Sequence, residues 1–365
     1  MSNQSRELTV WLGTPCNLNC KYCFQNMGTP NLHAQMKFLN KKLLPDIIDF
    51  CSNNNVKVIN LYGGEPLFNR PLFKYVVNEI HKELPDMKFA TTTNGTLLDE
   101  EIIELFENLD FEISLSLDGN KNTHDYYRGG FDLIKKRFPR LIKLKNITIN
   151  KQLVNIENLY RDVNDIWSFG FKHVIVNIIE NKGWYSYADV KVFEKEYEKL
   201  ILDMIDKKNV YLEDAIYIFF EQFKPKKEES CGIMEDALCM YVDGKLYPCL
   251  RAPELGDDFS IGHIRSGIDS EKEVKIRSYI RNSTLKFLND NNRLLCPVSI
   301  YLENKKFTRP HETWSMMVNT KEKLIAKHHF ELENFVKSII KNNVQDPPHQ
   351  FRYYDIQFRS KGRHN

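Results

Sequence analysis

Three cysteines, Cys16, Cys20 and Cys23, lie within eight residues near the start of the chain, in the stretch WLGTPCNLNCKYCFQN. Thiolates at such short spacing are typical ligands of zinc or of an iron–sulfur cluster. A closed zinc site needs four ligands, whereas three thiolates on a four-iron cubane leave one iron open. The spacing therefore favours a [4Fe–4S] cluster with one free coordination position. A zinc loop with a remote fourth ligand is the alternative.

Four further cysteines lie in the second half of the chain, at Cys231, Cys239, Cys249 and Cys296. Together they supply one complete ligand set for a second [4Fe–4S] cluster. With four thiolates this auxiliary cluster would relay electrons, because it would have no iron open to substrate. If Cys239 instead belongs to the hydrophobic core, an open iron is left. A zinc knuckle is the other interpretation of these four residues.

The elements that must position these cysteines alternate regularly over the first 210 residues. Strands are expected at 8–13, 56–64, 88–95, 111–119, 146–154 and 172–179, and helices between them at 71–84, 99–109 and 189–208, among others. Six βα units in succession predict an α/β fold with a parallel sheet curled into a partial (β/α)6 TIM-like barrel. In that architecture chemistry gathers at the carboxyl ends of the strands.

Several polar or glycine-rich motifs directly follow these predicted strands. They are the cysteine triad, GGEPL (63–67), TTNGT (92–96) and SLDG (116–119). Because the carboxyl ends of parallel strands meet at one edge, we expect these motifs to surround a common site.

The βα alternation stops after about residue 210. The charged stretch 223–232 is typical of a linker, and turn signals in 242–264 predict short hairpins. An amphipathic helix is expected at 319–343, opened by Asn319 or Thr320. The sequence thus predicts a barrel at 1–215, a small cysteine-bearing domain at 225–300 and a helical extension at 301–365.

The triad followed by an aromatic residue, Phe24, resembles the radical S-adenosylmethionine (SAM) superfamily. The resemblance implies that the open iron chelates the amino and carboxylate groups of SAM, and that one electron then splits the sulfonium to a 5′-deoxyadenosyl radical. It also implies that Gly63, Gly64 and Glu65, in GGEP, receive the SAM ammonium group.

The resemblance extends to two later motifs of the barrel. Ser116 and Arg128 correspond to the pair that holds the SAM carboxylate in the branch containing sulfatase-maturing enzymes, and an arginine fork suits a carboxylate. Asn94 and Asp118 are further candidates for SAM contacts, with turn chemistry as the alternative for each.

The second cysteine set resembles the opening of the family's auxiliary-cluster module, the SPASM domain. Cys231, Gly244 and Cys249 match its pattern, and no later cysteines are present for another cluster. The chain is therefore similar to the shortened twitch form, with one auxiliary cluster. Sulfatase maturases carry an aspartate, a proposed general base, where this chain has Leu250. Asp243 and Glu254 are the nearby residues that could replace it.

The resemblance implies hydrogen abstraction from a peptide or protein, as in ribosomal peptide maturation by cross-linking, epimerisation or oxidation. The alternative is a small-molecule dehydrogenase or carbon-skeleton enzyme with one auxiliary cluster. A non-catalytic iron–sulfur electron carrier is a third class, and the SAM-contact motifs argue against it. A flavodoxin- or ferredoxin-type protein would supply the electrons.

Composition restricts the partners further. The 51 Lys and Arg nearly balance 49 Asp and Glu, which argues against nucleic acid and membrane surfaces. No apolar run approaches the ~18 residues of a membrane span, so we expect a cytoplasmic protein. Only 15 residues precede Cys16, so recognition of a leader peptide is expected from the C-terminal extension or from a separate protein.

Overall fold

The computed structural model describes residues 6–23, 25, 35–179, 184–221, 237–285, 296, 298, 301 and 312–341. Phe24 and the predicted cluster ligand Cys231 lie outside the described residues, as does the linker predicted at 223–232.

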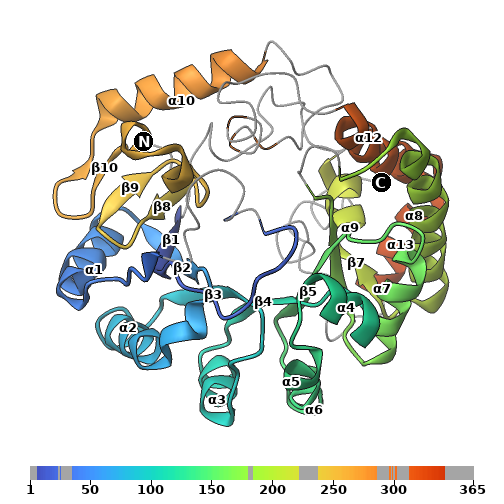
Figure 1. Cartoon of the computed structure of the whole chain (residues 1–365), viewed down its shortest axis with the longest axis horizontal. Helices are drawn as coiled ribbons and strands as arrows, with labels where there is room; N and C mark the ends of the chain where they lie inside the picture. The colour runs from blue at the N-terminus through green and yellow to red at the C-terminus, as the bar shows by residue number, and fades with distance from the viewer. Residues whose placement is uncertain are drawn as a thin grey trace.

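Seven parallel strands form the centre of the molecule, in chain order across the sheet. They are β1 (Arg6–Gly13), β2 (Val56–Gly63), β3 (Lys88–Thr93), β4 (Glu112–Ser116), β5 (Ile147–Gln152), β6 (His173–Asn177) and β7 (Tyr211–Leu212). The strands curve into an open ring, so the predicted α/β fold with a partial barrel is confirmed (Figure 1). The short strand β7 was not among the six expected.

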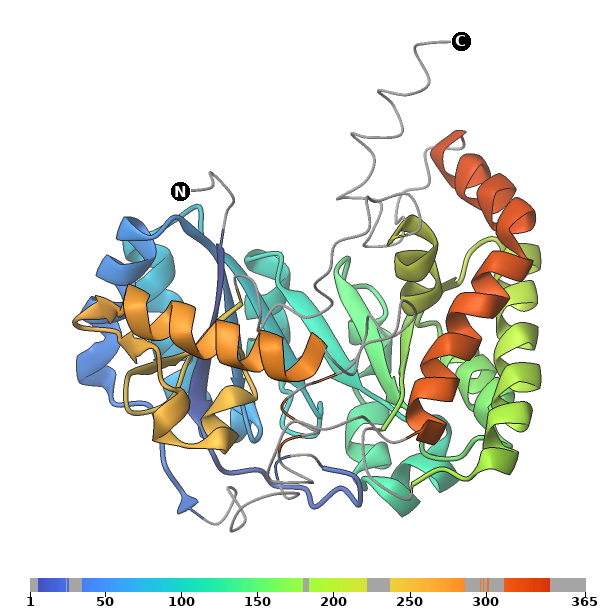
Figure 2. The same cartoon turned by 90° about the horizontal axis from the view of Figure 1, so that it is seen from above.

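Helices cover the outside of this ring (Figures 1 and 2). They are α1 (Leu44–Asn53), α2 (Arg70–Glu83), α3 (Glu100–Asn108), α4 (Lys121–Tyr127), α5 (Phe131–Lys135), α6 (Phe138–Leu141), α7 (Leu159–Ser168), α8 (Tyr187–Lys207) and α9 (Glu213–Glu221), with 3₁₀ turns η3 (Lys41–Leu43) and η4 (Pro66–Asn69). No described helix combines the length and the apolar character that crossing a membrane requires.

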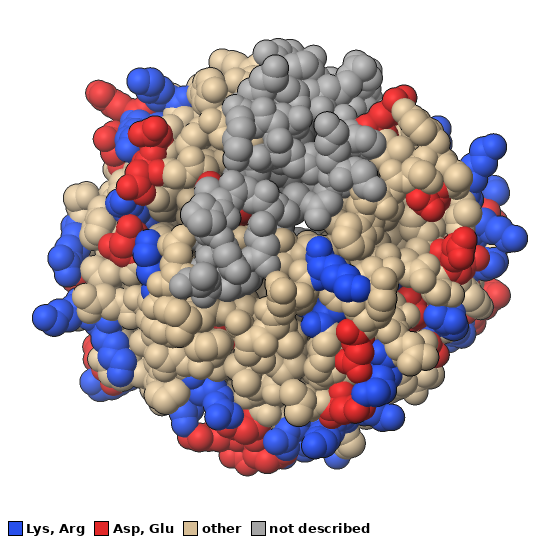
Figure 3. Space-filling model, viewed as in Figure 1, with Lys and Arg blue, Asp and Glu red and all other residues tan. Residues whose placement is uncertain are grey.

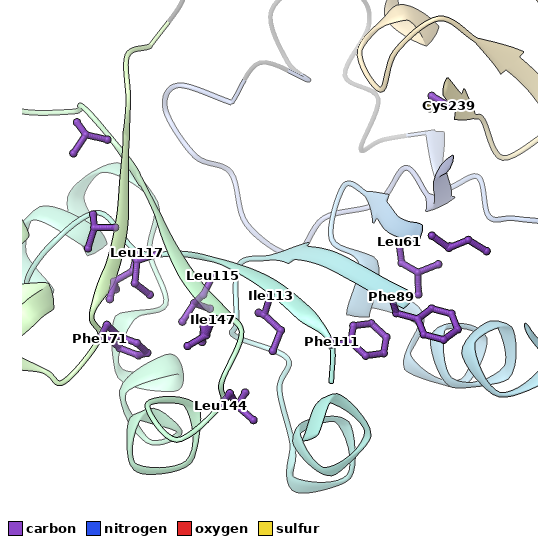
Figure 4. Packing of buried hydrophobic residues seen from close by; sticks show 14 of the residues in the cluster. Leu61, Phe89, Phe111, Ile113, Leu115, Leu117, Leu144, Ile147, Phe171 and Cys239 are labelled. Atoms are coloured by element: carbon purple, nitrogen blue, oxygen red, sulfur yellow. The ribbon is translucent and has the colours of Figure 1, made fainter. Parts of the chain in front are cut away.

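The main core lies between the strands and these helices. Alternate strand residues point outward into it, and Leu61, Phe89, Ile113 and Leu115 form one row (Figure 4). The rings of Phe89 and Phe111 stack 5.3 Å apart. The other strand positions point into the ring, and toward the carboxyl ends they carry polar residues. This alternation leaves a polar interior at the edge where the site was predicted.

Four short strands extend the same sheet beyond β1. Strand β8 (Leu238–Met240) pairs parallel with β1, and β9 (Lys245–Tyr247), β10 (Gly262–His263) and β11 (Gly267–Ile268) follow antiparallel. The 3₁₀ turns η6 (Ala252–Leu255) and η7 (Asp257–Phe259) and helix α10 (Ser270–Leu285) complete this region. The predicted hairpins are therefore present, and one continuous 11-stranded sheet joins them to the barrel.

The predicted helix at 319–343 is wrong at its start. Helix α12 begins at Glu312 and ends at Lys327, and α13 (His329–Lys341) follows after a bend. The residues before 319 are helical because Trp314 and Met317 are buried in this turn. Helix α12 packs along α8, as Figures 1 and 2 show. Its Lys321 Nζ donates to Asp214 Oδ2 at 2.7 Å, in a largely buried ion pair.

A capping box fixes the start of α8, the longest helix described. Ser186 Oγ accepts from Asp189 N, and Asp189 Oδ2 accepts from Ser186 N at 2.7 Å. We expect Ser186→Ala to lower the free energy of unfolding by about 1 kcal/mol, because the helix loses a cap. Anaerobic urea unfolding measures this. Ser168→Ala, at the exposed last residue of α7, should change it by much less, and equal effects would contradict the capping argument.

Candidate active site

A cavity of about 330 Å³ opens at the carboxyl ends of the barrel strands. The predicted site residues that line it are Cys16, Cys20, Cys23, Gly63, Gly64, Glu65, Asn94, Ser116 and Arg128. They come from the loop after β1, the ends of β2, β3 and β4, and the end of α4. The structure thus brings together all the residues predicted to hold the first cluster and SAM, except Asp118.

The loop with the three cysteines is held by backbone hydrogen bonds to the segment before η3 and to the end of α4. Thr14 N donates to Lys37 O at 2.9 Å, and Lys21 N donates to Tyr127 O at 2.9 Å. Asn94 stabilises the turn after β3 and also lines the cavity. Its Oδ1 accepts from Thr96 N at 2.9 Å, and its Nδ2 lies 3.8 Å from Cys16 Sγ.

The three thiols share one environment. Burial raises the pKa of each, and the charges of Cys20 and Cys23 act on Cys16 in the same direction. Thiolates in such a place require a positive partner, as iron would be. No three Cys, His, Asp or Glu side chains of the described residues converge as ligands of one metal ion. A cubane takes each thiolate on a different iron, so the donor set still fits a [4Fe–4S] cluster.

The two glycines of GGEP allow β2 to approach the cysteine loop closely. A Cβ on Gly63 would lie 2.3 Å from Gly13 O, and one on Gly64 would lie 2.3 Å from both Thr14 O and Pro15 O. Gly64 N donates to Gly13 O at 3.0 Å. The close approach is thus made to the chain's own backbone, and it fixes the cavity edge where the cysteine loop begins.

Glu65 is buried, and its carboxylate accepts hydrogen bonds from other groups of the protein. It accepts hydrogen bonds from Leu67 N at 3.1 Å, Thr93 Oγ1 at 2.6 Å and Asn94 N at 2.7 Å. Burial raises its pKa, against the effect of these donors. The side chain therefore ties η4 to the end of β3 at the cavity wall.

Asp118 does not line the cavity. It is fully buried and forms the centre of a network: Oδ2 accepts from Tyr22 OH and from Arg128 Nε at 3.3 Å, and Oδ1 accepts from Gln152 N at 3.0 Å. Burial is the largest single influence on Asp118 and opposes its ionisation, but Arg128, His124, Lys151 and the hydrogen bond from Tyr22 together lower its pKa. The contact of Asp118 with SAM stays a prediction, and in the structure its carboxylate is bonded to Arg128, which does line the cavity.

A second buried pair lies beneath this network and was not found from the sequence. Lys151 is fully buried, and its Nζ donates to Asp118 O at 2.8 Å and lies 3.6 Å from Asp162 Oδ2. Thr123 Oγ1 donates to Asp162 Oδ1 at 2.9 Å. A lone lysine in a β-strand sequence gives no signal that it points into the core.

Three amide side chains form the wall of the cavity at β5 and β6. Asn150 Oδ1 accepts from Gln152 Nε2 at 3.0 Å and from Asn177 Nδ2 at 2.6 Å. All three line the cavity. The sequence analysis missed them, although the spacing of Asn150 and Gln152 on a strand placed both on one face.

His124 is a structural histidine. Its Nδ1 accepts from Asp118 N at 3.2 Å and its Nε2 lies 3.1 Å from Gly129 O, which assigns the proton to Nε2. Burial lowers its pKa from 6.5 to about 4. A histidine held neutral in this way stabilises the fold above its ordinary pKa, and the contribution is lost as the pH falls toward 4.

We therefore expect the free energy of unfolding to fall by about 1 kcal/mol between pH 7.5 and 5.5 because of His124, since the unfolded state takes up the proton first. Urea unfolding at both pH values measures the loss. In His124→Gln the loss over this interval should be smaller by about that amount. An identical pH dependence in the two proteins would contradict the assignment.

The second cysteine set lies next to the first cavity. Cys239 is fully buried in β8, belongs to the hydrophobic core and faces Thr9 of β1 in register. Cys249, whose charge acts on Cys239, follows β9. Cys296 Sγ accepts from Arg251 Nη1 at 3.7 Å, and Arg251 also lines the cavity. Among the described cysteines of this set, Cys239 and Cys249 are neighbours. Cys296 is bonded to Arg251, which lines the cavity of the first set.

Neither residue suggested as a replacement base lines the cavity. Asp243 lies in the turn between β8 and β9, half-exposed, with Lys245 Nζ 3.4 Å from its carboxylate. Glu254 is buried behind Arg251, with 3.9 Å between Glu254 Oε1 and Arg251 Nε. The cavity residue that the sequence analysis overlooked here is Arg251.

Charge on the face of the molecule seen in Figure 3 is mixed. Lysines and arginines alternate with acidic residues around the rim, in keeping with the near balance of the whole chain. This face therefore presents no extended surface of one sign.

Comparison with known proteins agrees with this geometry. The model of the radical SAM superfamily matches residues 12–176. A cysteine-type anaerobic sulfatase-maturating enzyme of Clostridium perfringens is 26% identical over 274 residues, which are 64% of this chain and 71% of that protein. The radical SAM cyclopropyl synthase TigE of Paramaledivibacter caminithermalis is 23% identical over 80% of this chain and 66% of its own.

Among solved structures, native anSMEcpe with bound AdoMet and Cp18Cys peptide superimposes with a TM-score of 0.69. The match covers 91% of this chain and 99% of that one at 18% sequence identity. This likeness shows a common fold, including the parallel sheet and the region beyond it.

Proposed function

We propose that this chain, whose residues 12–176 match the radical SAM superfamily, cleaves SAM reductively and abstracts hydrogen from a peptide or protein substrate. The observation that carries this proposal is the convergence of the three cysteines, Ser116 and Arg128 on one cavity. Eight separate segments of the chain contribute to that cavity, which no isolated turn or surface group explains.

The first cluster would be held by Cys16, Cys20 and Cys23. When bound, a [4Fe–4S] cluster with an open iron supplies the electron that splits SAM into methionine and a 5′-deoxyadenosyl radical. The chain's own residues bind and orient the SAM. Arg128, fixed by Asp118 and beside Ser116 in the cavity lining, receives the carboxylate, and the Gly63–Glu65 segment receives the ammonium group.

The second cluster is proposed at Cys231, Cys239, Cys249 and Cys296, and with all four thiolates bound it would relay electrons. Cys239 is also a residue of the hydrophobic core, and without it one iron would be open to substrate. The proximity of Cys239 to Cys249, and the link from Cys296 to the cavity through Arg251, support a site within reach of substrate. We retain the division into a barrel at 1–215, an auxiliary-cluster region at 225–300 and a helical extension at 301–365 as part of this proposal.

A peptide or protein substrate is supported by the relatives. The similar Clostridium perfringens enzyme is named for maturing sulfatases, which are proteins, and a structure with the same fold holds a peptide beside AdoMet. The amide side chains of Asn150, Gln152 and Asn177 offer donors and acceptors that suit peptide groups. A flavodoxin- or ferredoxin-type donor completes the reaction, and a separate leader-recognition protein is a further proposed partner.

The test uses the anaerobically reconstituted enzyme with SAM and dithionite. We expect 5′-deoxyadenosine and methionine in chromatography, and a change in mass or stereochemistry in a peptide encoded beside the gene. No cleavage of SAM by cluster-loaded enzyme would refute the proposal. Unchanged peptides together with turnover of a small metabolite would replace the peptide substrate by a small-molecule one.

A further inference from the structure

Arg251 lies where the two cysteine sets meet. Its side chain lines the cavity that Cys16, Cys20 and Cys23 also line, and its Nη1 donates to Cys296 Sγ at 3.7 Å. The backbone beside it is anchored, because Trp11 Nε1 donates to Leu250 O at 3.2 Å. Arg251 is therefore placed by β1 as well as by its own turn.

The charge of Arg251 is opposed by a carboxylate with few other partners. Glu254 Oε1 lies 3.9 Å from Arg251 Nε, and the Glu254 side chain is 1% exposed. Within the described part of the chain, neither Glu254 oxygen accepts a hydrogen bond. Only 12% of the Arg251 side chain is exposed, so solvent screens this ion pair weakly. Such an arrangement is costly for stability alone, which points to a use for the two charges.

We propose that Arg251 sets the reduction potential of the second cluster through its N–H···S bond to Cys296, while Glu254 holds the guanidinium in place and partly offsets its charge. The inference rests on the second cluster of the proposed function. Hydrogen bonds to cluster sulfurs and the net charge nearby are the main protein influences on such potentials. In this role Arg251 acts on the cluster through Cys296 and does not touch the reacting atoms.

The two charges predict shifts of opposite sign. Reduction adds one negative charge to a cluster, so a cation beside its thiolate favours the reduced state and raises the potential. Arg251→Gln should therefore lower the midpoint potential. Glu254→Gln should raise it, because it removes the negative charge that offsets the guanidinium. A merely structural pair would not produce opposite shifts.

The experiment is a potentiometric titration followed by electron paramagnetic resonance at pH 8.5. It uses the full chain with Cys16, Cys20 and Cys23 replaced by alanine, so that only the second cluster gives a signal. For Arg251→Gln we expect a decrease of about tenfold in the equilibrium constant for reduction, or ~59 mV for one electron. Glu254→Gln should shift it upward, and Arg251→Lys should fall between Arg251→Gln and the parent protein.

Arg265→Gln is the matched control. Arg265 Nε lies 2.9 Å from Asp46 Oδ2 in a more exposed ion pair of the same region, so its removal changes the net charge equally. The proposal fails if Arg251→Gln and Glu254→Gln shift no more than this control, or shift in the same direction. If Arg251→Gln does not retain iron, Glu254→Gln decides alone, and the absence of an upward shift overturns the proposal.

The test separates this inference from the function on which it rests. If the triple-alanine protein binds no four-iron cluster while the wild type cleaves SAM, the second cluster and the role of Arg251 fall together, and the radical chemistry stands. If the second cluster is present with an unshifted potential, only the role of Arg251 falls.

Discussion

Replacing Cys20 with alanine is expected to reduce 5′-deoxyadenosine formation to background while one four-iron cluster stays on the chain. Two thiolates cannot hold a cubane in the orientation that presents an open iron, and the second set does not involve this residue. Cys20 lines the cavity beside Arg128, so its loss also removes a charge partner of that guanidinium. Product chromatography and iron analysis, which should fall from about eight to about four atoms per chain, measure the effect.

Cys51→Ala is the matched control for this prediction. Cys51 is buried in α1, among core residues and away from the cavity lining, and the substitution is chemically identical. We expect full iron content and full SAM cleavage from it. Unimpaired SAM cleavage by Cys20→Ala, or equal losses in the two variants, would contradict the assignment of the triad.

Asp118→Asn is expected to weaken both the fold and the binding of SAM. The substitution keeps the shape but leaves the buried guanidinium of Arg128 without its counter-charge, which costs about 3–5 kcal/mol when one partner of a buried pair is removed. At roughly 2 °C per kcal/mol for a large chain, the thermal midpoint should fall by roughly 6–10 °C. Arg128 would also lose its fixed orientation, so the Kd for SAM should rise.

The measurements are anaerobic thermal unfolding and equilibrium binding of SAM. Asp132→Asn serves as the control, because Asp132 also pairs with a cation, Lys121, but at the exposed surface. Such surface pairs contribute ~0–1 kcal/mol, and Asp132 is not in the cavity lining. A normal midpoint and normal SAM affinity in Asp118→Asn would show that Arg128 needs no buried partner.

Much of the barrel could be predicted because its strands carry a strong local signal. Runs of β-branched and aromatic residues bounded by Gly, Asn or Asp placed the ends of the six long strands within three residues of those observed. The helices expected at 99–109 and 189–208 begin within two residues of the observed starts of α3 and α8, which Asp99 and Ser186 cap. Strand β7 has only two residues, too few for a periodic pattern to appear.

Pairing between distant segments left no such local signal. The parallel contact of β8 with β1 joins residues about 230 positions apart, Leu238 and Leu8 among them, and three residues of strand do not specify a partner. The start of α12 was misplaced for a related reason. Its first turn buries Trp314 against Ile178, a contact between distant segments.

In the candidate site, the residues that belong to motifs were predicted from the sequence. The residues that hold those motif residues in place were not. The cysteines, GGE and Ser116 stand directly at strand ends, where a barrel collects its chemistry. Asp118, by contrast, has the same placement in sequence yet points into the protein, and one residue's direction at a strand end is decided by three-dimensional packing. Arg251 shows the opposite failure: as the second residue after Cys249 it had no pattern of its own.

The continuous sheet has a consequence for the movement of electrons. Because β8 is hydrogen-bonded to β1, and β1 leads directly into the cysteine loop, the separation of Cys239 from that loop is set by neighbouring strands about 4.8 Å apart rather than by a flexible tether. Tunnelling rates fall exponentially with distance. In the proposed two-cluster enzyme, a spacing fixed by main-chain hydrogen bonds would therefore keep the rate of electron transfer between the clusters constant.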